Sequence, residues 1–395
     1  MQSKNSLDGI ILNNRYQFIK KIGLGTYGLI YLVKDLCDDG KLLAAKFILK
    51  NAPKFTNKYE VQKYIETHFN NIDSINIPQL SISSFKSNIN ASYMKEIALH
   101  LKVQQHENIA TIHQVFETDI TMIVIMDYFP QGDLFKNIIE NNIFENNPIL
   151  MKNVILQLIS ILSYCHQNSI FHCDLKPENI MVNYNRNYVR KPNSPIVNLQ
   201  ECQIYLIDFG LSMSSNLISG DSCRGSSFYM APERITNYGS SPYIKSMIDL
   251  SKYHYSHQNN NYYFPTDKGD IWSLGIIIIN ITCSRNPWPK ASITDLEKDD
   301  STNVFIDYMI RQNHFVLSQI LPISQQFNHL LNKIFKLDPS ERIDLNHLYQ
   351  AVYHLDFFND LSSPPPTDEE DDFYFDEIPT LSHDYQKVLN HYIQF

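Results

Sequence analysis

The chain has 395 residues, and its 33 Lys and Arg against 42 Asp and Glu give a formal net charge of -9. A hydrophobic share of 43% and a charged share of 19% are typical of globular proteins, which excludes collagen, coiled-coil and wholly disordered classes. The acidic balance also argues against a protein that neutralises nucleic-acid backbones, so we expect no nucleic-acid partner.

The six cysteines show no paired metal-ligand spacing, and we interpret them as reduced thiols of an intracellular protein, cytoplasmic, nuclear or both. The first residues open no apolar run of the signal-peptide type. The longest apolar stretch, Ile271–Cys283, is shorter than the ~20 residues that a membrane span requires. We therefore expect a buried core helix there and no membrane partner. The oligomeric state stays open.

The first ninety residues are β-rich, and residues 16–126 are predicted to form a small lobe. Three β-branched and aromatic runs alternate with glycine-containing turns, and they are Tyr16–Lys21, Ile30–Lys34 and Leu42–Leu49. Residues 127–131 are expected to connect this lobe to a second one. From residue 149 the apolar side chains recur at helical spacing, as in Ile155, Leu158, Ile159 and Leu162. This pattern predicts a larger, mainly helical lobe over residues 132–357.

Three segments, 51–90, 183–200 and 238–265, are expected to be insertions. They are rich in polar residues or prolines, and a compact domain rarely contains connections longer than ~15 residues without structure of their own. We therefore expect mobile surface elaborations there. Residues 1–15 are interpreted as an N-terminal extension before a domain at 16–357. Residues 358–395, with three prolines before an acidic run, are expected to be a disordered tail.

A glycine-rich loop, Gly23-Leu24-Gly25-Thr26-Tyr27-Gly28, is the first chemical signal. Alone, this GxGxxG spacing also occurs in ordinary turns and in dinucleotide-binding loops. A dinucleotide-binding loop opens a helix, whereas strand-like residues starting at Ile30 follow this one, which rejects a dinucleotide-dependent oxidoreductase. A glycine-rich hairpin lets backbone amides approach phosphate groups without obstruction by Cβ atoms.

Lys46 is the second signal, because it lies inside an apolar run, where an ammonium group needs a partner. Glu96, in the helical stretch Tyr93–Val103, is the candidate partner. Three further motifs follow in order, and they are His172-Cys173-Asp174-Leu175-Lys176-Pro177-Glu178-Asn179, Asp208-Phe209-Gly210 and Met230-Ala231-Pro232-Glu233. With this set the sequence resembles eukaryotic protein kinases from about Tyr16 to Leu355. The resemblance implies a bilobal α+β fold, in which an antiparallel β-sheet lobe with one main helix precedes a larger helical lobe.

The resemblance also assigns roles to individual residues. Asp174 would accept the proton of a substrate hydroxyl, Lys46 would contact the phosphates of ATP, and Glu96 would orient Lys46. Asn179 and Asp208 would hold Mg²⁺. Lys176 belongs to the catalytic set and is similar to the serine/threonine version of the loop. The residues that would enclose ATP are Ile22, Gly23, Gly25, Gly28, Ile30, Ala44, Lys46, Met126, Asp127, Phe129, Asp133 and Met181. For Met126, Asp127, Phe129, Asp133 and Met181, a role in the core stays as open as a direct contact.

Two further matches have structural roles. By the same resemblance, Glu233 would pair with Arg342, and Asp270 would brace the backbone of the catalytic loop. Several short motifs, among them His172-Cys173-Asp174 and Asn286-Pro287-Trp288-Pro289, are similar to a fungal group of serine/threonine kinases linked to nutrient response and meiotic entry.

The implied function is transfer of the γ-phosphate of ATP to Ser and Thr hydroxyls of protein substrates, in intracellular signalling of that kind. The alternative is a pseudokinase scaffold that binds nucleotide without transfer. It is less favoured because every residue that transfer requires is present, namely Lys46, Glu96, Asp174, Asn179 and Asp208.

The sequence departs from the family pattern at three positions. His100 stands where an apolar residue usually packs near Phe209. In kinases that are switched by phosphorylation, an arginine and a second basic residue together bind a phosphorylated side chain. Here Cys173 replaces the arginine and Met213 replaces the second basic residue. Since a phosphate brings about -1.5 to -2 charges and needs cationic partners, we expect activity without such phosphorylation. Arg224 is the cation that could restore the usual mechanism.

Overall fold

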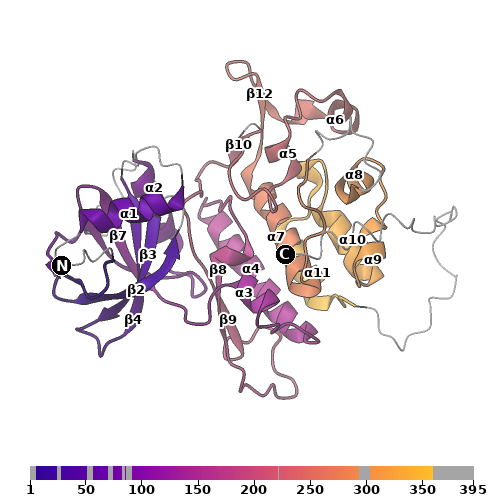
Figure 1. Cartoon of the computed structure of the whole chain (residues 1–395). Helices are drawn as coiled ribbons and strands as arrows, with labels where there is room; N and C mark the ends of the chain where they lie inside the picture. The colour runs from indigo at the N-terminus through magenta and orange to yellow at the C-terminus, as the bar shows by residue number, and fades with distance from the viewer. Residues whose placement is uncertain are drawn as a thin grey trace.

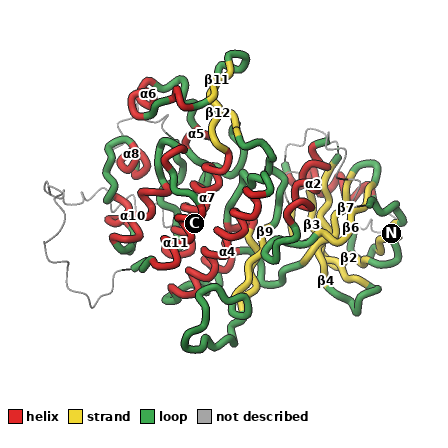
Figure 2. The backbone as a smooth tube through the Cα atoms, turned by 180° about the vertical axis from the view of Figure 1, so that it is seen from behind, coloured by secondary structure: helices red, strands yellow, loops and turns green. Residues whose placement is uncertain are grey.

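The computed structural model describes residues 6–24, 28–50, 57–69, 74–81, 85, 91–220, 222–292 and 303–358. Two lobes are visible in Figure 1, with the β-sheet at the N-terminal side and most helices in the C-terminal lobe. The same division is clear from behind in Figure 2, where the long strands gather in one lobe. The expected bilobal α+β fold is therefore confirmed.

Seven strands form the sheet of the N-terminal lobe, in the order β5-β1-β2-β3-β4-β7-β6. Their bounds are β1 Ile11–Leu12, β2 Tyr16–Leu24, β3 Gly28–Asp35, β4 Leu42–Leu49, β5 Ser74–Ile75, β6 Ile112–Glu117 and β7 Thr121–Asp127. Successive side chains of a strand point to opposite faces. In β4, Ile48 therefore packs toward helix α2 (Ser92–Val103), while Phe47 packs on the other face. Lys46 shares the α2 face with Ile48.

The outer face of this sheet is covered by segments that we expected at the surface. Helix α1 (Lys58–His68), within residues 51–90, buries Val61 and Ile65 against this face, and β5 pairs with β1. Leu7 and Leu12 are buried there too. The compact lobe thus begins before residue 16, and the described parts of segment 51–90 belong to it. An apolar sheet face needs a cover, because leaving it in water costs about 25 cal/mol per Å².

The C-terminal lobe contains the remaining elements. In chain order they are α3 Leu134–Ile139, α4 Pro148–Gln167, η2 Pro177–Asn179, β8 Ile180–Tyr184, β9 Cys202–Leu206, β10 Leu217–Ser219, α5 Pro232–Ile235, α6 Pro242–Met247, η3 Leu250–Lys252, β11 His254–Ser256, β12 Asn261–Pro265, α7 Thr266–Cys283, α8 Val304–Met309, α9 Val316–Ile320, α10 Gln325–Ile334, η4 Pro339–Glu341 and α11 Leu345–His354.

Two long helices, α4 and α7, form the centre of this lobe. The stretch Ile271–Cys283, expected as a core helix, lies in α7, and almost every residue of that helix is buried. Helix α4 is long and apolar enough to cross a membrane by length and composition. However, 67% of its most apolar window is buried inside the protein, where it packs against α7, α11 and β9. Its apolar character is thus explained by the core.

The other two expected insertions are also folded. In segment 183–200, Arg190 pairs with Glu201, and Asn198 contacts Tyr188. Segment 238–265 contains α6, η3, β11 and β12. Neither segment is the mobile surface elaboration that we expected. Polar side chains made both segments less hydrophobic, but some of these side chains form local hydrogen bonds.

Candidate active site

A partly buried cation and two carboxylates meet between the lobes. Lys46 on β4 lies 2.5 Å from Oε1 of Glu96 on α2 and 2.9 Å from Oδ1 of Asp208. Burial would lower the pKa of the Lys46 ammonium, but the charges of Asp208 and Glu96 outweigh burial and raise it. Lys46 in turn lowers the pKa of Asp208 well below its usual value. Burial raises the pKa of Glu96, against the effect of the Lys46 charge. The three predicted residues are thus brought together within ion-pair distance.

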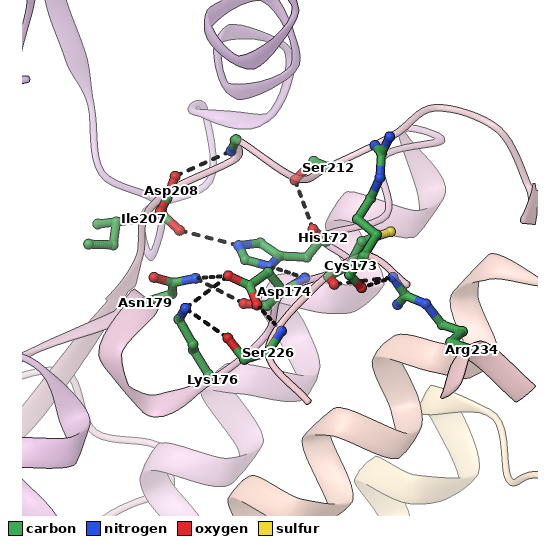
Figure 3. Close-up of polar contacts among 12 residues, drawn as sticks. His172, Cys173, Asp174, Lys176, Asn179, Ile207, Asp208, Ser212, Ser226 and Arg234 are labelled. Carbon is green, nitrogen blue, oxygen red and sulfur yellow. Dashed lines mark hydrogen bonds and ion pairs between the residues drawn. The ribbon is translucent and has the colours of Figure 1, made fainter. Parts of the chain in front are cut away.

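Asp174 lies in the catalytic loop, residues 172–179, and both of its carboxylate oxygens have polar contacts (Figure 3). The amide of Ser226 donates to Oδ1 at 2.7 Å, and Nζ of Lys176 lies 3.0 Å from Oδ2. Lys176 also donates to Oγ of Ser226 at 3.0 Å. Asn179, in η2, donates from Nδ2 to the main-chain carbonyl of Asp174 at 2.9 Å. The side chain of Asp174 is therefore fixed in a defined orientation.

Asp270 stabilises the backbone of this loop. Its carboxylate accepts hydrogen bonds from the amides of His172 at 2.8 Å and Cys173 at 2.9 Å, and His166 lies 3.1 Å away. Burial would raise the pKa of Asp270, but these contacts outweigh it and keep the pKa low. Cys173 has a φ of 64°, a left-handed conformation that costs free energy and that these bonds support.

A second buried pair joins the segment after Asp208 to the end of the domain. Arg342 donates to both carboxylate oxygens of Glu233, at 2.8 and 2.6 Å, and both side chains are at most 1% exposed. The pairing that the resemblance implied is therefore present in the structure. Because a buried charge without its partner is costly, each side chain requires the other.

Several residues expected around ATP lie on strands of the N-terminal sheet. Gly23 pairs with Ile30 across β2 and β3, and Ala44 pairs with Met126 across β4 and β7. At Gly28, a Cβ atom would lie 2.1 Å from the carbonyl oxygen of Phe47, so only glycine fits this approach of β3 to β4. Ile22 is 39% exposed on β2. Gly25 lies outside the described residues.

The residues expected at the connector and under the base of ATP have contacts of their own. The Asp127 carboxylate accepts from the amide of Thr111 and contacts His113, so it is directed at β6. Phe129 stacks on Tyr205, with ring centroids 4.4 Å apart. Asp133 caps α3 through the amide of Lys136, at 2.8 Å, and forms an isolated bridge with Met181. None of these four residues is fully buried, so a structural role and a direct contact with ATP both stay open for them.

His100 takes the place of the usual apolar residue without disturbing α2. Its ring stacks on Phe209, with centroids 4.7 Å apart, and Nε2 donates to the carbonyl of Ala110 at 2.6 Å. Because the acceptor is a carbonyl, Nε2 carries the hydrogen. Burial lowers the pKa of His100 to about 4, so the ring is neutral near pH 7.

The sequence analysis missed two buried contacts of the catalytic loop. Arg234 is only 3% exposed and donates to the carbonyls of Cys173 and Arg224. Ser212 donates to the carbonyl of His172 at 3.1 Å. The position of Arg234 directly after Glu233 was a possible signal, since a charged residue beside a buried motif needs partners. Ser212 carries no such signal in the sequence.

The donor set suits Mg²⁺ as the resemblance implies. In the part of the chain that the structure describes, no three His, Cys, Asp or Glu side chains converge on one metal position. Mg²⁺ is ordinarily bound by one or two carboxylates and completes its shell with water and phosphate oxygens, so a closed cage is not required. The Asp208 side chain is 41% exposed and ionised, and Asn179 retains its Oδ1 as a ligand atom.

Comparison with known proteins agrees with this geometry. Residues 60–354 match the protein kinase domain family. Two serine/threonine-protein kinases of Saccharomyces cerevisiae, VHS1 and SKS1, are each 36% identical to this chain over 89% of its length. The aligned part covers 73% of VHS1 and 67% of SKS1. A negative regulator of sexual conjugation and meiosis from Schizosaccharomyces pombe is 35% identical to 87% of the chain, which spans 61% of it.

These matches confirm the resemblance to fungal kinases and its serine/threonine character. The matched range includes α2, the catalytic loop and the pair formed by Glu233 and Arg342. The chain therefore belongs to the protein kinase family, as a serine/threonine protein kinase of the group that includes these two budding-yeast kinases.

Proposed function

We propose that the protein transfers the γ-phosphoryl group of ATP to Ser and Thr hydroxyls of protein substrates, with Mg²⁺ as the metal. The observation that carries the proposal is the contact of Lys46 with both Glu96 and Asp208, because transfer requires this cation and these carboxylates together. A scaffold that only binds nucleotide has no need for all three.

In this reaction Asp174 accepts the proton of the attacking hydroxyl, and the contacts with Ser226 and Lys176 keep its carboxylate oriented. The ammonium of Lys176 offsets negative charge beside that hydroxyl. Lys46 would hold phosphate oxygens, while Asp208 and Asn179 would hold the metal. When bound, the metal would neutralise charge on the phosphate groups. Positioning and electrostatic stabilisation thus account for the work of these residues.

We further propose that the kinase acts inside a fungal cell, in the cytoplasm, the nucleus or both, in nutrient or meiotic signalling. Support comes from the S. pombe relative, which is named as a negative regulator of conjugation and meiosis. All six cysteines are free thiols, which fits a reducing compartment.

The test of transfer is phosphorylation of a generic protein substrate with γ-labelled ATP, compared with Lys46→Met. The matched control is Lys50→Met. Lys50 directly follows β4, but its ammonium pairs with Glu117, 2.5 Å away. We expect labelled Ser and Thr with the wild type and Lys50→Met, and none with Lys46→Met. Nucleotide binding without transfer by the wild type would support the scaffold alternative instead.

We also propose a preference for basic residues before the phosphorylated Ser or Thr. Glu178 is exposed in the catalytic loop, and Asp133 lies at the N-terminus of α3, so two carboxylates are available to attract Arg or Lys. A degenerate peptide array tests this, with Glu178→Gln expected to weaken the basic preference. A dominant proline directly after the acceptor, with no basic preference before it, would contradict the proposal.

A further inference from the structure

The segment between Asp208 and Glu233, called here the activation segment, pairs with a strand of insertion 238–265. Strand β10 of the activation segment is antiparallel to β12, and β11 completes a three-stranded sheet in the order β10-β12-β11. The amide of Gly220 donates to the carbonyl of Tyr262, and that of Thr266 to the carbonyl of Asn216, both at 2.9 Å. Figure 1 shows this sheet projecting from the C-terminal lobe.

Side chains of the two segments also pack together. Ile218 of β10 lies opposite Phe264 of β12, and they are 3% and 1% exposed. The Phe264 ring lies in edge contact with Tyr238, at 5.3 Å between centroids, and at 4.8 Å from Tyr253. A Cβ atom on Gly220 would lie 2.9 Å from the Phe264 ring. The activation segment is therefore fitted closely to the insertion.

The insertion is itself anchored to the end of the domain. The Tyr253 hydroxyl donates to Asp338, and the amide of Ser340 donates to that hydroxyl at 3.1 Å. The Tyr238 hydroxyl donates to the carbonyl of Leu337 at 3.2 Å. Both tyrosines thus connect Phe264 to the turn at η4, directly before Arg342.

The position of β10 matters for the catalytic site. A few residues after β10, Ser226 contacts Asp174 through its amide and Lys176 through its hydroxyl. A residue spans at most ~3.6 Å of extended chain, so fixing Gly220 limits where Ser226 can move. The usual means of fixing this segment is absent, because Cys173 is buried and uncharged, and Met213 pairs through its backbone with Phe171.

We propose that residues 238–265 form an intramolecular strap, which pairs with the activation segment and holds it in the arrangement that accepts protein substrates. Tyr253 and Phe264 are its positioning residues, because they connect β10 to the turn at η4. The strap thus orders the activation segment, as a phosphorylated side chain does in kinases that have cations to bind it. The proposal rests on the proposed phosphoryl transfer and adds how that site is kept ordered.

The experiment compares Tyr253→Phe with Tyr255→Phe in the full chain. The first variant removes the hydroxyl that contacts Asp338 and Ser340, and the second removes one that contacts Asn260 at the exposed end of the hairpin. The measurements are kcat and KM for a Ser/Thr peptide, KM for ATP, Tm, and amide hydrogen exchange of residues 216–220. Phe264→Ala and Phe264→Leu extend the series, since leucine restores most of the apolar volume.

For Tyr253→Phe we expect a three- to tenfold lower kcat/KM for peptide, as the loss of about 1 kcal/mol predicts, with KM for ATP unchanged. Exchange in 216–220 should become faster, and Tm should stay near that of the wild type. Phe264→Ala should have a larger effect that Phe264→Leu largely reverses, whereas Tyr255→Phe should behave as wild type.

Unchanged kcat/KM or unchanged exchange of residues 216–220 in Tyr253→Phe would overturn the proposal. A fall in kcat/KM of equal size in Tyr255→Phe would overturn it too, since that hydroxyl makes no contact with the η4 turn. If Phe264→Ala fails to fold, Tyr253→Phe alone decides. A wild type without any transfer would refute the proposed function, and the exchange measurement would then still show whether the strap holds β10.

Discussion

The main-chain amide of Ser226 donates a hydrogen bond to Oδ1 of Asp174, 2.7 Å away. The activation segment therefore touches the residue expected to accept the substrate proton, and it does so through the backbone, which only substitution by proline removes. The Ser226 hydroxyl adds a contact with Lys176. Order in this segment and the orientation of Asp174 are consequently linked.

Ser226→Ala should lower kcat while leaving KM for ATP unchanged. The change removes the acceptor of the Lys176 hydrogen bond but keeps the amide bound to Asp174. A net hydrogen bond contributes about 1 kcal/mol, so we expect a loss of roughly five- to tenfold. Steady-state kinetics measures it, with Ser227→Ala at an exposed position as the control. Equal kinetics of the two variants would argue against a role for the hydroxyl.

Asp208→Ala should abolish transfer and leave the fold intact. Asp208 contacts Lys46 in the cleft, and its side chain is 41% exposed, so it contributes little to the core. We expect a fall in kcat/KM on the order of 10³-fold, and a change in the free energy of unfolding within about 1 kcal/mol. Asp38→Ala, at an exposed turn, serves as the control. Preserved activity with a large loss of stability would contradict the assignment.

His100 should make stability depend on pH. Burial lowers its pKa to about 4 in the folded protein, against about 6.5 in the unfolded chain. Between these values the unfolded chain binds a proton that the folded protein does not, so stability falls as the pH falls from about 6.5 to about 4. The full effect is about 3 kcal/mol. Urea unfolding at several pH values measures it.

The control for this prediction is His100→Leu, which keeps an apolar side chain against Phe209 and removes the titration. The difference in unfolding free energy between wild type and variant should change across the same pH interval. A difference that stays constant with pH would show that His100 does not titrate as its burial predicts.

Protein treated with phosphatase should keep its activity. Cys173 is buried and Met213 carries no charge, so a phosphate on the activation segment lacks the two cations that usually bind it. Arg224 donates to the carbonyl of Leu211 at 3.5 Å, and its own carbonyl accepts from Arg234. Kinetics before and after treatment, with mass spectrometry of the segment, is the measurement. A many-fold loss restored by phosphorylating one serine of the segment would show that phosphate is required.

The residues of the candidate site could be identified because most of them lie in contiguous motifs. Asp174, Lys176 and Asn179 lie within six residues, and the loop that contains them needs these residue types to position a hydroxyl and a metal. Lys46 was identifiable because an ammonium in an apolar strand must have a partner, and the α2 face supplies Glu96. The bilobal division followed from the change of apolar spacing along the chain.

Only the tertiary structure shows which elements the inserted segments pack against. The cover that α1 provides for the sheet and the pairing of β10 with β12 join residues far apart in the sequence. Strand pairing uses backbone amides and carbonyls, which every residue except proline carries in full, so it leaves little trace in side-chain composition. Polar residues made 238–265 resemble a loose insertion, although its buried Phe264 and backbone hydrogen bonds fix it to the activation segment. The candidate catalytic residues were thus identifiable from local sequence, whereas the pairing of the activation segment with residues 238–265 depends on contacts between distant strands.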